Sequence, residues 1–132
     1  MICLVTGVAG FVGSHLAEKL LAAGHTVRGV DKFLGNYPRR FKEWNLAQVS
    51  RHAGFEFIDK DIVDLDLRSL LRDVTYVFHQ AAQPGVRSSW GAEFAEYTHN
   101  NIFATQKLLE AAKNSSIKKF VYASSSSVYG DT

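Results

Sequence analysis

Short apolar runs alternate with longer segments of mixed polarity along the whole chain. The runs are rich in β-branched and aromatic residues, which favours strands. They are Ile2–Val5, Thr26–Val30, Phe55–Ile58, Thr75–Phe78 and Phe120–Ala123. The first run is apolar throughout and bounded by Gly7, as is typical of a strand buried on both faces of a sheet.

The segments between these runs predict helices. Those segments are Phe11–Ala23, Pro38–His52, Leu65–Leu71 and Ala92–Lys113. Apolar residues recur on a helical period in the first two, and we expect them to contact the core. The expected contacts are Phe11, Val12, Leu16, Leu20 and Ala23 in one helix, and Phe41, Leu46 and Val49 in the other. Gly24 and Gly54 stand where these helices should end.

Strands separated by helices predict a parallel sheet with right-handed crossovers, an open doubly wound α/β fold. A length of 132 residues corresponds to one domain, which we place over residues 1–132. A complete dinucleotide-binding sheet usually has about six strands. Because the chain stops at Thr132, soon after its last predicted strand, we expect the carboxyl-terminal strands and a substrate domain to be missing.

Composition excludes several classes of protein. Apolar residues make up 46% and charged residues 21%, and no stretch approaches the roughly 18 apolar residues of a membrane span, so disordered, collagen-like and transmembrane classes drop out. The net charge of +2 gives no case for nucleic acid or a membrane surface as partner. Cys3 has no partner for a disulfide, and no basic region precedes the apolar start. We therefore expect a cytoplasmic protein.

A glycine-rich loop, Thr6–Gly13, lies between the first strand and the first helix with the spacing GxxGxxG. Glycines there allow a tight turn and let the backbone approach a pyrophosphate, while the helix amino terminus offers free N–H groups. The alternative is a turn that merely caps a helix. We expect a dinucleotide site.

Asp31 follows the second strand, 18 residues after Gly13. A carboxylate there accepts hydrogen bonds from the adenosine ribose and repels a 2′-phosphate, which favours NAD over NADP. The neighbouring Lys32 works against that preference. A solvated turn aspartate is the alternative.

Asp61 and Ile62 follow the third strand, where a carboxylate and a backbone amide could read the adenine edge. The alternative is that Asp61 caps the helix that follows, although Asp64 or Asp66 could also do this. His15, His25, His52 and Cys3 show no metal-ligand spacing, so no metal site is expected.

Motifs in order along the chain resemble the extended short-chain dehydrogenase/reductase family, in its branch of NAD-dependent nucleotide-sugar epimerases and dehydratases. They are Thr6–Gly13, Asp31, Asp61–Ile62, His79–Ala82, Asn101 and Ala123–Gly130. The loop Gln83–Ser89 and the Val-Tyr-Gly end look most like UDP-glucose or UDP-glucuronate 4-epimerases. This resemblance implies the amino-terminal part of a Rossmann-type NAD domain.

The resemblance also implies roles for individual residues. Cofactor-binding residues would be Gly7, Gly10, Phe11, Val12, Gly13, Asp31, Lys32, Asp61, Ile62, Ala81, Ala82, Asn101 and Ser124. Substrate-binding residues would be Gly85, Val86, Arg87, Ser125 and Ser126. The small side chains of Ala81 and Ala82 would pass under the cofactor, or reflect ordinary tight packing. Arg87 would contact a phosphate or carboxylate, or simply face solvent.

Ser125 is the expected catalytic residue, because in the family a hydroxyl at this position hydrogen-bonds the sugar hydroxyl being oxidised. Related dehydratases carry Thr-Asp-Glu from that position, whereas this chain has Ser125–Ser127, which favours epimerisation. The family's catalytic base belongs to a Tyr-x-x-x-Lys pair. Tyr97 and Tyr122 have no lysine four residues later, and Tyr129 belongs to a different motif.

The expected parent reaction is therefore reversible oxidation and reduction of a UDP-sugar at C4, and the isolated chain should be inactive. The alternatives are a UDP-glucuronate decarboxylase, which typically carries an acid where Ser127 stands, a dehydratase relative, or a non-catalytic nucleotide-binding module. The resemblance implies a homodimer in the parent. We expect the chain itself to self-associate, through large apolar residues of Ala92–Lys113 and the edge of the last strand.

Overall fold

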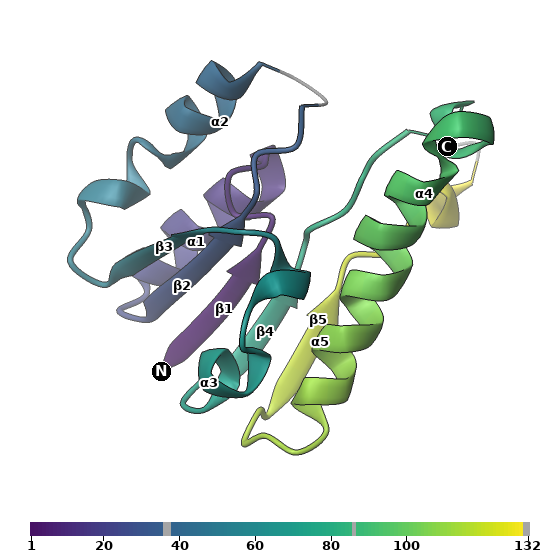
Figure 1. Cartoon of the computed structure of the whole chain (residues 1–132). Helices are drawn as coiled ribbons and strands as arrows, with labels where there is room; N and C mark the ends of the chain where they lie inside the picture. The colour runs from purple at the N-terminus through teal and green to yellow at the C-terminus, as the bar shows by residue number, and fades with distance from the viewer. Residues whose placement is uncertain (36–37, 86, 131–132) are drawn as a thin grey trace.

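The computed structural model describes residues 1–35, 38–85 and 87–130. A parallel sheet runs through its centre in the order β3-β2-β1-β4-β5, as Figure 1 shows. The strands are β1 (Ile2–Thr6), β2 (Thr26–Asp31), β3 (Phe55–Asp59), β4 (Tyr76–His79) and β5 (Lys119–Tyr122). The predicted α/β fold and its parallel strands are confirmed, with small differences at the strand ends.

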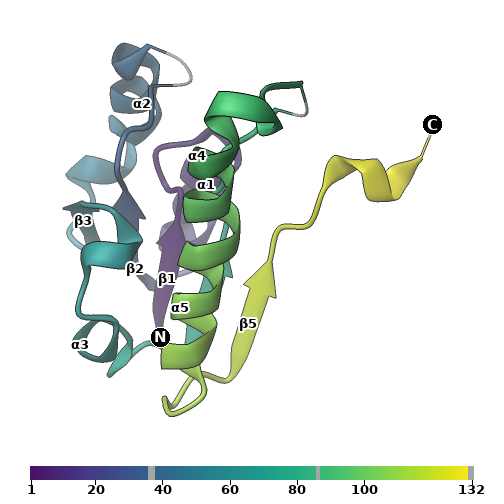
Figure 2. The same cartoon turned by 45° about the vertical axis from the view of Figure 1, so that its right-hand side comes forward.

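Helices cover both faces of the sheet (Figures 1 and 2). They are α1 (Phe11–Ala22), α2 (Arg39–Leu46), α3 (Leu67–Leu71), α4 (Phe94–Tyr97) and α5 (Ala104–Ala112). Successive residues of β1 point to opposite faces, so Leu4 packs with α3 and α5 while Val5 packs with α1 and α2. Each face therefore has its own apolar core, as expected for a doubly wound sheet.

The buried stripe of α1 agrees only in part with the predicted one, since Leu16 and Leu20 are half-buried against the core as expected but the other predicted contacts are not. Phe11 and Val12 are 73% and 61% exposed, and Ala23 is exposed as well. The buried residues are Gly13, Ser14, Ala17 and Leu21. Small residues on this face let the helix approach the sheet closely, which turns the large apolar residues of its first turn away from the core.

The predicted helix Pro38–His52 is shorter than expected. After α2 the chain turns, and a single 3-10 turn, η1 (Val49–Arg51), precedes the loop to β3. Leu46 and Val49 are buried as predicted, but Phe41 is 41% exposed and the prediction for it was wrong. Lys42 takes the buried position instead.

The predicted helix Ala92–Lys113 is continuous but not uniform. A 3-10 turn, η4 (Gly91–Glu93), leads into α4, which passes through a π-helical stretch, η5 (Thr98–Phe103), into α5. Its outer face carries large apolar side chains that are 45–62% exposed: Phe94, Ile102, Phe103 and Leu109. The expectation that part of this apolar set faces outward is confirmed. No helix in the described part of the chain is long and apolar enough to cross a membrane.

Candidate functional site

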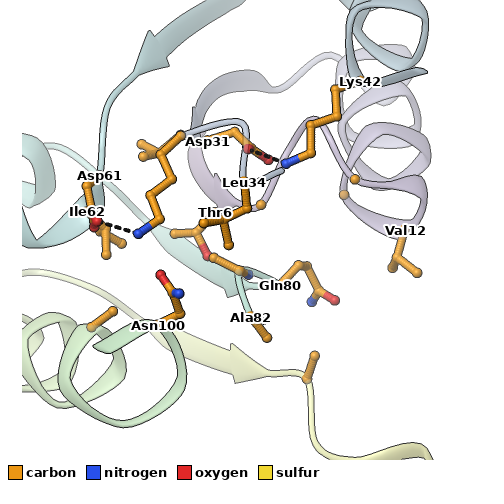
Figure 3. Close-up of a pocket in the computed structure, with 18 of the residues that line it drawn as sticks. Thr6, Val12, Asp31, Leu34, Lys42, Asp61, Ile62, Gln80, Ala82 and Asn100 are labelled. Atoms are coloured by element: carbon orange, nitrogen blue, oxygen red, sulfur yellow. Dashed lines mark hydrogen bonds and ion pairs between the residues drawn. The ribbon is translucent and has the colours of Figure 1, made fainter. Parts of the chain in front are cut away.

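A cavity of about 380 Å³ opens at the carboxyl ends of β1, β2 and β4 (Figure 3). This is where the strand order of an open α/β sheet reverses and where such folds bind ligands. All the predicted cofactor-binding residues line it except Asn101 and Ser124. The other lining residues are Thr6, Val30, Leu34, Lys42, Lys60, Gln80, Pro84, Asn100, Ala104 and Ala123.

The glycine loop is pressed against the end of β4. Gly7 has φ +67°, and a Cβ atom there would lie 2.8 Å from the Ala81 nitrogen. A Cβ atom at Gly13 would lie 2.2 Å from the Gly7 carbonyl oxygen. Neither position has room for a side chain, so these glycines are needed by the turn itself.

The amino terminus of α1 suits an anion. Its N-cap residue, Gly10, has extended backbone, and among the described residues no side chain caps the helix and no acidic residue occupies its first turn. A Cβ atom at Gly10 would meet only the Gly7 oxygen, at 3.1 Å. Gly10 and the first turn line the cavity, so free N–H groups and the helix dipole are available there to a phosphate. The cradle fits the pyrophosphate of a dinucleotide.

Asp31 is held by three donors and is only 9% exposed. Its Oδ2 accepts a hydrogen bond from the Ala9 N–H at 3.1 Å, and its Oδ1 accepts from the Phe33 N–H at 2.8 Å and from Lys42 Nζ at 3.1 Å. A solvated turn aspartate is therefore excluded. Lys42 was missed from the sequence, although a lysine in register with buried Leu46 and Val49 signals a buried cation that needs an acid.

Asp61 caps a short turn and also lines the cavity. Its Oδ1 accepts from the Val63 N–H at 3.0 Å and so caps a 3-10 turn, η2 (Ile62–Asp64). Its Oδ2 accepts from Lys32 Nζ at 2.6 Å and from His99 Nε2 at 2.8 Å, with Asp61 lining the cavity. The cap of α3 is Asp66, as the alternative allowed.

The charge state of Asp61 is set by opposing effects. Burial by itself raises the pKa of the carboxyl, but the hydrogen bonds from Lys32, the Val63 N–H and His99 outweigh it, so the Asp61 pKa lies below its ordinary value. The carboxylate is thus ionised at neutral pH and available as an acceptor.

A buried hydrogen-bond chain joins the glycine loop to the long helix. Thr105 Oγ1 donates to the Asn101 carbonyl at 2.8 Å, so its only proton is used and His79 Nε2 must donate to it, at 2.9 Å. His79 Nδ1 then accepts from Thr6 Oγ1 at 2.7 Å, and Thr6 Oγ1 in turn accepts from the Ala81 N–H at 3.1 Å. Burial lowers the His79 pKa to about 4, so the ring is neutral at neutral pH, as this series of hydrogen bonds requires.

The π-helical stretch η5 places two neighbouring asparagines differently. Asn100 is 6% exposed and lines the cavity, as Figure 3 shows. The predicted residue Asn101 instead clamps the loop after β4, since its side chain accepts from the Gln83 N–H at 2.7 Å and donates to the Gln83 carbonyl at 3.0 Å. Sequence reasoning missed Asn100 and His99. Their role depends on the widened turn of a π-helix, which leaves no periodic signal.

The predicted substrate loop after β4 is held by hydrogen bonds to the long helix, while its Arg87 is exposed to solvent. Tyr97 Oη donates to the Pro84 carbonyl at 2.9 Å and lies 2.6 Å from Ser88 Oγ. Gly85 has φ +112°, and a Cβ atom there would collide with Tyr97 Oη. Arg87 is exposed and begins a 3-10 turn, η3 (Arg87–Ser89), whose two serines are half-buried. Val86 lies outside the described residues.

The serine segment is not brought into the cavity. Ser124, Ser125 and Ser126 are exposed, and Ser125 Oγ accepts from the Ser127 N–H at 3.2 Å as the cap of η6 (Ser126–Tyr129). Figure 2 shows this segment, in yellow, leaving the body of the protein after β5. Among the described residues, no group of three His, Cys, Asp or Glu side chains is arranged to hold a metal ion.

Comparison with known proteins identifies the relatives of this chain. It is 51% identical over 129 residues to the protein named uncharacterized UDP-glucose epimerase YtcB of Bacillus subtilis, and 39% identical over 129 residues to a UDP-glucuronate 4-epimerase of Thermodesulfobacterium geofontis. The matches cover 97% and 96% of this chain but 41% and 40% of those proteins. The chain thus spans about two fifths of the length of the curated relatives it matches.

A solved structure resembles it over its full length. UDP-glucuronic acid 4-epimerase from Bacillus cereus, in complex with UDP-glucuronic acid and NAD, superposes with a TM-score of 0.94 at 47% identity, covering 100% of this chain and 42% of that one. The family described as NAD dependent epimerase/dehydratase matches residues 3–132. The sequence match, the order of the strands and the close-packed glycine loop are all consistent with one another, and the chain belongs to the NAD-dependent epimerase/dehydratase family.

Proposed function

We propose that this chain is the NAD-binding part of an enzyme that interconverts UDP-sugars at C4, acting on UDP-glucose or UDP-glucuronate. The observation that carries the proposal is the uncapped amino terminus of α1 above the glycine cradle, with the buried carboxylate of Asp31 at the end of the next strand. The relatives and the solved complex support both the cofactor and the substrate class.

Different residues of the cavity would bind different parts of the cofactor. The first turn of α1 would bind the pyrophosphate, Asp31 the adenosine ribose, and Asp61 with the Ile62 N–H the adenine edge. Ala81 and Ala82 would lie beneath the nicotinamide end. NAD, when bound, would supply a reversible hydride acceptor for the oxidation and reduction of the sugar at C4.

The protein groups for the sugar are fewer in this chain. Ser125 would orient the C4 hydroxyl and stabilise the developing carbonyl, with Ser124 near the nicotinamide and Gly85, Arg87 and Ser126 near the substrate. Within the 132 residues no tyrosine is followed four positions later by a lysine. The expected proton-transfer pair is therefore not supplied here, and we propose that the 132-residue chain alone does not turn over UDP-sugars.

Calorimetric titration of the chain with NAD and NADP tests the cofactor assignment. We expect NAD to bind more tightly, because a 2′-phosphate would face the Asp31 carboxylate. Gly10→Val should weaken binding by blocking approach to the helix terminus, and circular dichroism checks that the variant folds. Equal affinities for the two nucleotides, or undiminished NAD affinity of folded Gly10→Val, would contradict the assignment.

We also propose that the complete parent enzyme is a homodimer and that this chain self-associates. The apolar outer face formed by Phe94, Ile102, Phe103 and Leu109 is exposed in the monomer and supports this. Sedimentation at micromolar concentration should show dimers or larger species, and Ile102→Lys should reduce them. A monomer throughout that range would contradict self-association.

A further inference from the structure

Two lysine–aspartate pairs flank the adenosine side of the cavity, Asp31–Lys42 and Asp61–Lys32 (Figure 3). They differ in burial. The Asp31 and Lys42 side chains are 7% and 6% exposed, whereas the Asp61 and Lys32 side chains are 16% and 23% exposed. The deeper pair stands at the position expected for the ribose.

The lysine that pairs with Asp31 is not the one next to it in the sequence. Lys32 follows Asp31 directly, yet its ammonium group lies 2.6 Å from the Asp61 carboxylate. Lys42, on α2, is the lysine that meets Asp31, and its ammonium group also lies 5.7 Å from the centre of the Phe33 ring. The cation beside the ribose carboxylate is therefore Lys42, which lines the cavity.

The donors on Asp31 limit what its carboxylate can still accept. A carboxylate has about four acceptor sites. Oδ1 already accepts from the Phe33 N–H and Lys42, whereas Oδ2 accepts only from the Ala9 N–H among the described contacts. One hydrogen bond from a ribose hydroxyl can therefore be added readily at Oδ2, and the second ribose oxygen needs a donor. The ammonium group of Lys42 can supply it.

We propose that Lys42 determines cofactor specificity together with Asp31. The two form a neutral acceptor and donor pair for the adenosine ribose hydroxyls, and Lys42 is the cation that would receive a 2′-phosphate once the negative charge of Asp31 is removed. The proposal rests on NAD binding as the function of the cavity. It makes the preference for NAD depend on one carboxylate, because the cation needed for NADP is already in place.

Calorimetric titration of NAD and NADP into charge variants of the chain tests this. Asp31→Asn should shift the ratio of NADP to NAD affinity toward NADP by about tenfold or more, since a repulsive charge is lost and the lysine stays. Adding Lys42→Gln to Asp31→Asn should abolish that shift. The matched variant Lys32→Met in the Asp31→Asn background should weaken the binding of both nucleotides alike and leave the shift in their ratio in place, because Lys32 pairs with Asp61.

Each outcome separates the proposal from the broader function. If the shift survives Lys42→Gln, or is removed by Lys32→Met, Lys42 is not the specificity residue, although NAD binding stands. If the unaltered chain binds neither nucleotide, the proposed function fails instead. Should Lys42→Gln unfold the double variant, as thermal melting would show, Asp31→Asn with Lys42→Arg keeps the charge and must retain the shift.

Discussion

The ends of β2 and β4, at Asp31 and His79, and the serine segment after β5 differ in how firmly neighbouring residues hold them. Both lie at carboxyl ends of parallel strands. Asp31 and His79 are 9% and 1% exposed and are hydrogen-bonded to other segments of the chain, whereas every residue from 121 to 130 is exposed. Among the described residues, the Ser125 side chain forms a hydrogen bond only with the Ser127 N–H of its own segment.

The difference comes from position in the sheet. β2, which ends at Asp31, pairs with β1 and β3, and β4, which ends at His79, pairs with β1 and β5, so the groups at both strand ends lie between neighbouring strands. β5 pairs with β4 on one side and forms the edge of the described sheet. A central strand end is preorganised by its neighbours, whereas an edge strand end gains no such restraint from these residues.

Replacement of Gly13 by alanine should have the largest effect on stability among the changes to the well-packed part of the site. A Cβ atom there would lie 2.2 Å from the Gly7 oxygen, so the loop must move. We expect the free energy of unfolding, measured with urea, to fall by about 3 kcal/mol or more. Gly10→Ala is the matched control, because its nearest contact would be 3.1 Å, and should cost far less. Equal losses would mean that the loop is not tightly packed.

The stability of the chain should depend on pH through His79. Its pKa is about 4 in the folded protein against an ordinary value of 6.5, so the unfolded chain binds the proton more readily. The contribution of neutral His79 to the free energy of unfolding should be fully present above pH 6.5. It should decrease as the pH falls toward 4 and level off below, with a total loss of about 3 kcal/mol. Urea unfolding across this range gives the curve.

His79→Gln provides the control for that curve, because glutamine has no titrating group in this range. The difference between the unaltered chain and the variant isolates the contribution of His79 from the other groups. Identical pH dependence of the two proteins would show that the ring is not kept neutral by burial.

Thr105→Val should break the buried chain at its far end. The variant leaves the Nε2–H of His79 without its acceptor, which costs about 1–3 kcal/mol of unfolding free energy. Thr105→Ser keeps the hydroxyl and should lose less. If the serine variant is as unstable as the valine variant, packing of the methyl group and not the hydrogen bond is what matters.

Ser125→Ala should have the smallest effect on stability, within about 1 kcal/mol, because the side chain is exposed and the change removes only the hydrogen bond that caps the short turn η6. In the complete parent enzyme the same change should lower turnover by about 10²-fold, with less effect on substrate affinity. Ser126→Ala is the matched control and should do little. A larger loss with Ser126→Ala would show that the assigned register of the serines is wrong by one.

The sequence by itself determined the elements and the place of the site. Apolar runs and helical periods depend on nearby residues, and so do the conformations that glycine alone adopts. The strands, the loop at Thr6–Gly13 and the position of Asp31 at a strand end could therefore be predicted. The same local reasoning failed for Phe11, Val12 and Phe41, because the way a helix turns its face depends on what it packs against.

Only the tertiary structure decided which side chains meet. Thr6 and His79 are 73 positions apart, and Asp61 and His99 are 38 apart. Lys32 pairs with the distant Asp61, while Lys42 takes Asp31. Partners of this kind follow from the strand order and from the π-helical turn that sets Asn100 toward the cavity. Hydrogen bonds and ion pairs act over a few ångströms in space, so they are fixed only when the sheet brings distant segments together.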